Sequence, residues 1–230
     1  IVSVTNTNSG GSTLNGSVNA DSFTVKASTA GSTVNYVDNV TTSGALSVGS
    51  GAFNLVMTGN INSLGGATTL ANTGSITLGN SATNQFTFGN GLAITGSTNI
   101  TLGGSFIATA GALNFSGGAG SLLHAIYNTW VGGASTGDIT FSDIEESNGV
   151  TLTLGTGIAN NMSIGNIQGV AGGSASNVVL DSTGTVTVGS ITNDIGSLTI
   201  LNAGSLTFTG AVGASTDRIG AIFLKATSGD

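Results

Sequence analysis

Residues 177–196 read NVVLDSTGTVTVGSITNDIG, and residues 197–216 read SLTILNAGSLTFTGAVGAST. Aligned with Asn177 over Ser197, the two segments match at Val178/Leu198, Leu180/Ile200, Gly184/Gly204, Val186/Leu206 and Val188/Phe208. Each segment holds two apolar–x–apolar triplets separated by a turn that contains glycine, and such alternation places the apolar side chains on one face of short β-strands. A repeat this short cannot bury that face alone. The spacing therefore predicts stacked coils, the arrangement of a parallel β-solenoid.

The same triplets recur earlier in the chain. Between 74 and 117 they are Ile76–Leu78, Phe86–Phe88, Leu92–Ile94, Ile100–Leu102, Phe106–Ala108 and Leu113–Phe115. The first three triplets correspond in order to the last three, which predicts two successive coils with three faces each. Upstream of this region the expected strands are Val2–Val4, Phe23–Val25, Val34–Val37, Leu46–Val48 and Phe53–Val56. After residue 138 they are 139–141, 150–154, 162–164 and 222–224, the last delayed by an insertion at 214–218.

We therefore expect an all-β chain, with a single solenoid over residues 1–230 and about 20–24 residues per coil. Each coil would contribute two or three short strands, separated by corners rich in Gly, Ser, Thr and Asn. The side chains expected to point inward are Ile76, Leu78, Phe86, Phe88, Ile100, Leu102, Val186, Val188, Ile200, Leu206 and Phe208.

Composition excludes several classes of function. The 230 residues include 39 Gly, no Pro, no Cys, and only 3 Lys or Arg against 10 Asp or Glu. A formal charge of −7 argues against nucleic acid and against an anionic membrane surface as partners, because both attract basic proteins. The lack of cysteine excludes disulfides and thiolate metal sites. No stretch is apolar over the length of a membrane-spanning helix.

Residues 120–148 are read as an interruption of the repeat. They hold the only His, His124, and the only Trp, Trp130. The segment could form a short helix, a loop packed on the solenoid, or an aromatic-rich coil. His124 is the one candidate for the base of a Ser–His–Asp type of catalyst, which also needs a carboxylate to hold the ring. A structural role for this histidine is the favoured interpretation.

Asp143, Glu145 and Glu146 form the only cluster of acids. Strand alternation places Asp143 and Glu145 on one face and Ile144 on the other. This pair could bind Ca²⁺, which prefers several oxygen ligands, or could hydrolyse a glycosidic bond. The favoured interpretation is a solvated edge that supplies solubility. We accordingly expect no catalytic residue and no cofactor, with Ca²⁺ at Asp143 and Glu145 as the alternative.

Threonine occupies the middle of many triplets and should therefore face outward. The positions are Thr77, Thr87, Thr101, Thr140, Thr153, Thr187, Thr199 and Thr207. Stacked at the spacing of adjacent strands, these residues would form ladders. The favoured reason is that Thr combines polarity with a high β propensity. The alternative is a flat surface that binds ice.

The repeats resemble the β-strand-repeat segments of large bacterial surface exoproteins, of the filamentous haemagglutinin type and the autotransporter adhesins. The segments that carry this resemblance are 74–79, 99–103, 196–200, 204–210 and 220–226. The resemblance implies a right-handed β-helix, export across two membranes, and a role in adhesion or surface structure. It also implies an extracellular or cell-surface location on a bacterium.

Together these points predict a non-enzymatic structural or adhesive protein, for which a host or surface glycan could be a partner. The chain opens on Ile1 inside an apolar alternation, and the apolar segment Ile219–Lys225 runs almost to the C-terminus. We expect a segment of a longer protein or one subunit of a filament, in which the terminal coils stack on adjoining repeats or on other copies. The alternatives are a polysaccharide-binding or polysaccharide-cleaving β-helix, and an ice-binding protein.

Overall fold

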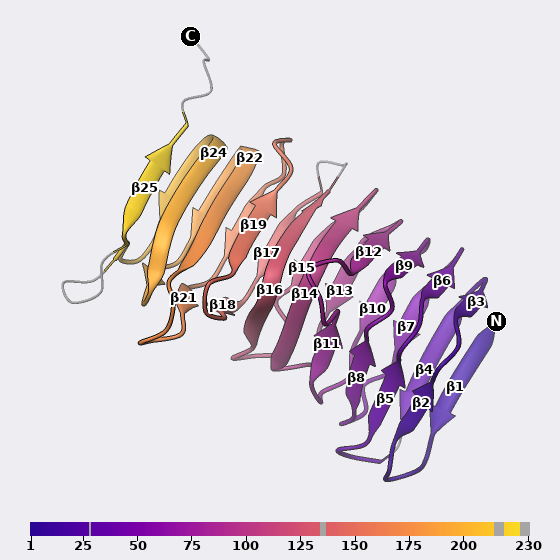
Figure 1. The fold of residues 1–230 in the computed structure, drawn as a ribbon. Helices are drawn as coiled ribbons and strands as arrows, with labels where there is room; N and C mark the ends of the chain where they lie inside the picture. Colours follow the sequence, from indigo (N-terminus) through magenta and orange to yellow (C-terminus); the bar gives the residue numbers. More distant parts are fainter. Residues whose placement is uncertain (28, 134–136, 214–218, 226–230) are drawn as a thin grey trace.

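The computed structural model describes residues 1–27, 29–133, 137–213 and 219–225 of the chain. Every regular element among these residues is a β-strand, and all strands pair in parallel within one 25-stranded sheet. The sheet winds into a rod, with β1 and β25 at opposite ends (Figure 1). The predicted all-β parallel solenoid is confirmed.

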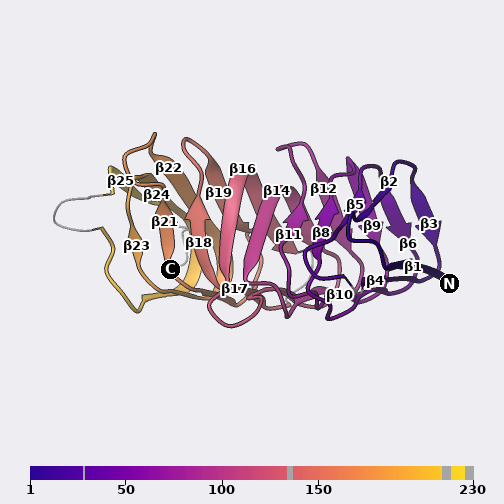
Figure 2. The ribbon, with the colours of Figure 1, turned by 90° about the horizontal axis from the view of Figure 1, so that it is seen from below.

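Three ladders of paired strands form the three faces of the rod (Figure 2). The first face contains β1 (Val2–Asn6), β4 (Phe23–Ala27), β7 (Leu46–Val48), β10 (Thr68–Leu70), β13 (Leu92–Ile94), β15 (Leu113–Phe115), β17 (Ile139–Phe141) and β20 (Met162–Ile164). The second contains β2 (Ser12–Leu14), β5 (Thr33–Tyr36), β8 (Asn54–Met57), β11 (Ile76–Leu78), β18 (Asp143–Glu146), β21 (Ile167–Gly169) and β23 (Ile191–Thr192). The third contains β3 (Val18–Ala20), β6 (Val40–Thr42), β9 (Ile61–Leu64), β12 (Gln85–Phe88), β19 (Thr151–Gly155) and β25 (Ala221–Leu224).

Four longer strands bend around a corner and belong to two faces. β14 (Asn99–Ala108) and β16 (Leu122–Gly133) pass from the second face to the third, whereas β22 (Ser176–Val188) and β24 (Ile195–Phe208) pass from the third to the first. The pairing register shifts within these strands, for example between Leu102 and Gly104, and the chain changes direction there.

The alignment of 177–196 with 197–216 predicted from the sequence is the pairing of β22 with β24. Val178 lies beside Leu198 and Val188 lies beside Phe208. The coil that runs from Leu154 to its partner Leu180 is somewhat longer than the expected range. The two coils with three faces predicted between 74 and 117 are also confirmed, since β11 pairs with β14, β12 with β14, and β13 with β15.

The interpretation of 120–148 as an interruption is wrong, and the aromatic-rich coil is the alternative that the structure shows. β16 pairs in parallel with β14 on one side and with β18 and β19 on the other. Seven further strands are absent from those predicted from the sequence: β2, β3, β6, β9, β10, β21 and β23. The insertion expected at 214–218 lies outside the described residues.

The core is a single column of side chains inside the rod. Phe106 stacks on Phe86 with ring centroids 5.0 Å apart, and meets Phe115 edge to face at 6.0 Å. Nine of the eleven residues predicted to point inward are buried. Leu206 and Phe208 are partly buried, because no described strand pairs with this end of β24 on its outer side.

Buried asparagines satisfy backbone groups at the corners. Asn72 is fully buried, and its amide donates to the carbonyl of Phe53 at 2.9 Å. Asn62 is also fully buried and accepts a hydrogen bond from the Val40 amide at 3.0 Å. Polar side chains therefore occupy inward positions without leaving these backbone groups unpaired.

Candidate functional site

The eight threonines predicted to face outward all lie outside the core, but they are divided among the three faces. Thr140, Thr187 and Thr207 are on the first face, Thr77 and Thr101 on the second, and Thr87, Thr153 and Thr199 on the third. Threonine alone thus forms no single continuous ladder among the described strands.

Serine completes one of these rows. The central outward positions of the first face, here called the hydroxyl row, are Ser3, Thr24, Ser47, Thr69, Ala93, Asn114, Thr140, Ser163, Thr187 and Thr207. Eight of these ten residues are Ser or Thr, and none is buried or charged. The row is regular because parallel pairing in register places equivalent residues directly beside one another.

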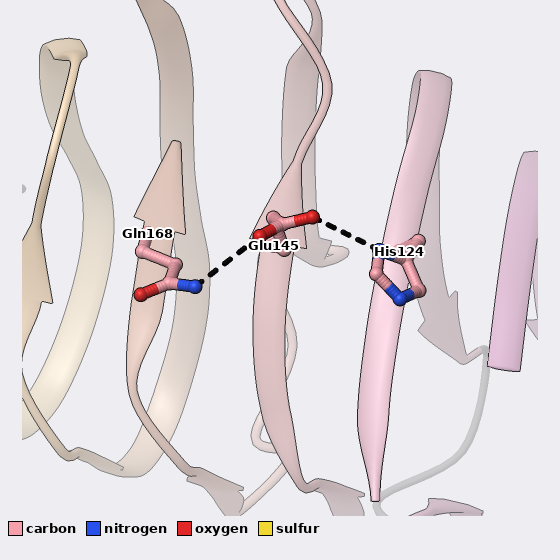
Figure 3. A network of polar contacts seen from close by, with 3 residues as sticks. All are labelled: His124, Glu145 and Gln168. Atoms are coloured by element: carbon pink, nitrogen blue, oxygen red, sulfur yellow. Dashed lines mark hydrogen bonds and ion pairs between the residues drawn. The ribbon is translucent and has the colours of Figure 1, made fainter. Parts of the chain in front are cut away.

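His124, Glu145 and Gln168 form a polar row on the second face, one residue from each of β16, β18 and β21 (Figure 3). His124 Nδ1 lies 3.1 Å from Glu145 Oε1, and Gln168 Nε2 donates to Glu145 Oε2 at 3.3 Å. The histidine and glutamate side chains are 29% and 30% exposed. A carboxylate that holds an imidazole in this way orients the ring, as it does in hydrolases.

On the other side of His124 in the ladder stands Thr101, not a serine. The pairing of His124 with Glu145 was not foreseen, because the two residues are distant in the sequence and meet only when the coil register is known. The prediction that His124 is structural is not decided by this geometry.

Asp143 and Glu145 lie outside the core and Ile144 is buried, as the alternation predicted. Asp143 Oδ1 accepts a hydrogen bond from the Asn166 backbone amide at 2.8 Å, so this carboxylate stabilises the next coil. Among the described residues, no three His, Asp or Glu side chains are grouped as metal ligands. The calcium alternative therefore remains a prediction.

The interpretation of the acid cluster as a solvated edge is wrong for Glu146. Alternation continues through β18, so Glu146 points inward with Ile144 and is 0% exposed. Neither carboxyl oxygen has a hydrogen-bond partner among the described residues. Its neighbours along the stack, Ala125 and Gly169, are small and leave room for the carboxyl group. Burial raises the pKa of Glu146 to about 9, because the charged form is poorly solvated in the core.

A shallow depression lies on the third face, where β14, β16 and β19 are adjacent. We call it the Trp130 depression; its volume is about 360 Å³, and its lining includes Trp130, Ser105, Asn128, Thr151 and Thr153. The sequence placed the tryptophan in an acidic and aromatic segment but did not indicate which way its side chain points.

The comparisons with protein-family models, curated proteins and solved structures give no significant match for this chain. The described residues include no helix that could cross a membrane.

Proposed function

We propose that this chain is a non-enzymatic structural and adhesive protein of the extracellular space or of a bacterial surface. Its surface carries rows of short polar side chains at the spacing of adjacent strands. The rod is therefore a rigid scaffold that presents these side chains in a fixed order. The low content of charged residues gives neighbouring rods little mutual repulsion.

The observation that carries the proposal is the uncovered edge of the last described coil. Ile222 and Leu224 of β25 are 54% and 73% exposed. They pair in register with Leu198 and Ile200, which are buried at 1% and 7% because another strand follows them. The same positions are thus buried wherever one more coil is stacked. This supports end-to-end stacking, either on adjoining repeats of a longer polypeptide or on another copy of the chain.

Electron microscopy and sedimentation of the chain test this proposal. Wild type is expected to form rods whose length grows with concentration, and Leu224→Lys is expected to shorten them because it places a charge on the stacking surface. Phe223→Lys is the matched control, since Phe223 occupies the outward position beside Thr199. A soluble monomer in which the backbone amides of Ile222 and Leu224 resist hydrogen exchange would contradict the proposal, because the edge would then be covered by the chain's own residues.

The proposed location has its own test. Antibodies against the chain should label intact cells of the source organism as strongly as permeabilised cells. Labelling only after permeabilisation would contradict an extracellular role.

Ice binding is the second candidate, and the hydroxyl row favours it. Eight hydroxyl side chains on one uncharged row could order water along the rod. Measurable thermal hysteresis, lost in Thr187→Lys and retained in Thr199→Lys on the third face, would support this function over the structural one. Equal freezing and melting points for the wild-type solution would exclude it.

A further inference from the structure

Trp130 is the one tryptophan of the chain, and it points outward. Its neighbours on β16, Thr129 and Val131, are buried at 2% and 0%, so alternation turns the indole away from the core. The residues paired with it along the stack are Ser105 and Thr153. Because both are short, the indole is left only half-buried.

The rest of the depression supplies neutral hydrogen-bonding groups. Ser105, Thr151 and Thr153 contribute hydroxyls, and Asn128 contributes a side-chain amide. The amide oxygen of Asn128 accepts a hydrogen bond from the Thr151 backbone amide at 2.8 Å, which fixes the side chain and leaves its NH₂ group as a donor. No charged residue lines the depression among the described residues.

An aromatic ring beside neutral donors and acceptors matches one class of ligand well. A pyranose ring has an apolar C–H face that packs on an aromatic surface, and hydroxyls around its edge that bond to side chains such as these. A phosphate, sulfate or carboxylate would find no cation among the described lining residues, and the net charge of −7 disfavours polyanions generally. The volume of about 360 Å³ lies within the usual range for small-ligand sites.

We infer that the Trp130 depression binds a neutral pyranose sugar, as one residue of a glycan that lies across the third face. The inference rests on the proposed adhesive function, because it states which class of ligand the protein would adhere to. It concerns a surface different from the stacking edge of β25 and from the hydroxyl row.

The indole fluorescence of Trp130 reports directly on the site. Titration with neutral oligosaccharides of glucose, galactose, mannose and N-acetylglucosamine should change the emission saturably for at least one series. Calorimetry should show that Trp130→Ala weakens binding of that sugar roughly tenfold, as expected for the loss of one stacked ring. Trp130→Tyr should retain part of the affinity, and Thr187→Ala on the first face should retain all of it. Circular dichroism checks that each variant keeps its β spectrum.

Three results would overturn the inference: no neutral sugar of the panel binds at tens of millimolar, Trp130→Ala binds as tightly as wild type, or only anionic sugars bind. The outcome is separable from that of the proposed function. Rods on the cell surface without a sugar-dependent emission change would refute this site alone. Sugar binding by a monomeric intracellular protein would refute the proposed function and leave the site standing.

Discussion

Replacement of the buried Glu146 by Met should stabilise the solenoid, and the gain should grow with pH. The free carboxyl titrates near 4.5, whereas burial raises the pKa of Glu146 in the folded protein to about 9. Between these values the folded state keeps a proton that the unfolded state releases. Raising the pH therefore favours unfolding throughout this interval.

The size of this destabilisation follows from the difference between the pKa of the free carboxyl and the pKa of Glu146 in the folded protein. From pH 4.5 to pH 7 is 2.5 units, and each unit is worth about 1.4 kcal/mol, so protonating Glu146 costs the folded state about 3 kcal/mol at pH 7. Met has nearly the same length and no group to ionise. The gain in unfolding free energy of Glu146→Met over wild type should be smallest near pH 4.5. It should increase up to about pH 9 and should then level off.

Urea unfolding followed by circular dichroism at pH 5, 6, 7 and 8 measures this advantage. The difference in unfolding free energy between Glu146→Met and wild type should widen by about 4 kcal/mol from pH 5 to pH 8. Thr140→Met is the matched control, because Thr140 lies outside the core and carries no titratable group. A difference that stays constant within about 0.5 kcal/mol over this range would refute the reasoning.

Three further changes test the core and the corners by the same urea unfolding. Phe106→Ala should lower the unfolding free energy by about 3–5 kcal/mol, and Ile107→Ala on the outside by less; equal losses would contradict the assigned faces. Asn72→Ala should cost about 1–3 kcal/mol, since it leaves a buried carbonyl unpaired, and an unchanged midpoint would contradict that bond. Gly155→Ala should cost more than Gly31→Ala, although both have positive φ, because only at Gly155 would the new Cβ meet a neighbouring backbone carbonyl. The reverse order would contradict this corner.

The sequence predicted the fold where inward positions are apolar, and failed where they are polar. β6, β9 and β10 have Thr42, Asn62 and Thr68 at buried positions, so the apolar alternation that signals a strand is broken in each. The same assumption, that polar residues point outward, misplaced Glu146. The sequence does not show that Glu146 has space inside the rod. That space comes from its small ladder neighbours Ala125 and Gly169, which are identified only once the strand register is known.

The candidate sites were predictable only in part, for a related reason. The outward direction of the threonines follows from local alternation, which the sequence contains. The grouping of His124 with Glu145, and of Trp130 with Ser105 and Thr153, depends on how many residues each corner takes. Corner lengths vary because loops of different length differ little in closure cost, so no local signal fixes them.

The register of the three-faced solenoid can be measured directly, since the chain contains no native cysteine and spin labels can be placed in pairs at will. One label at Thr187 is combined with a second at Thr69, Ser47 or Thr24, which lie five, six and seven strands away in the hydroxyl row. At about 4.8 Å per strand, pulsed dipolar spectroscopy should give separations of roughly 24, 29 and 34 Å in that order. Separations that do not increase by about one strand spacing per coil would contradict the parallel stack and the surface rows that depend on it.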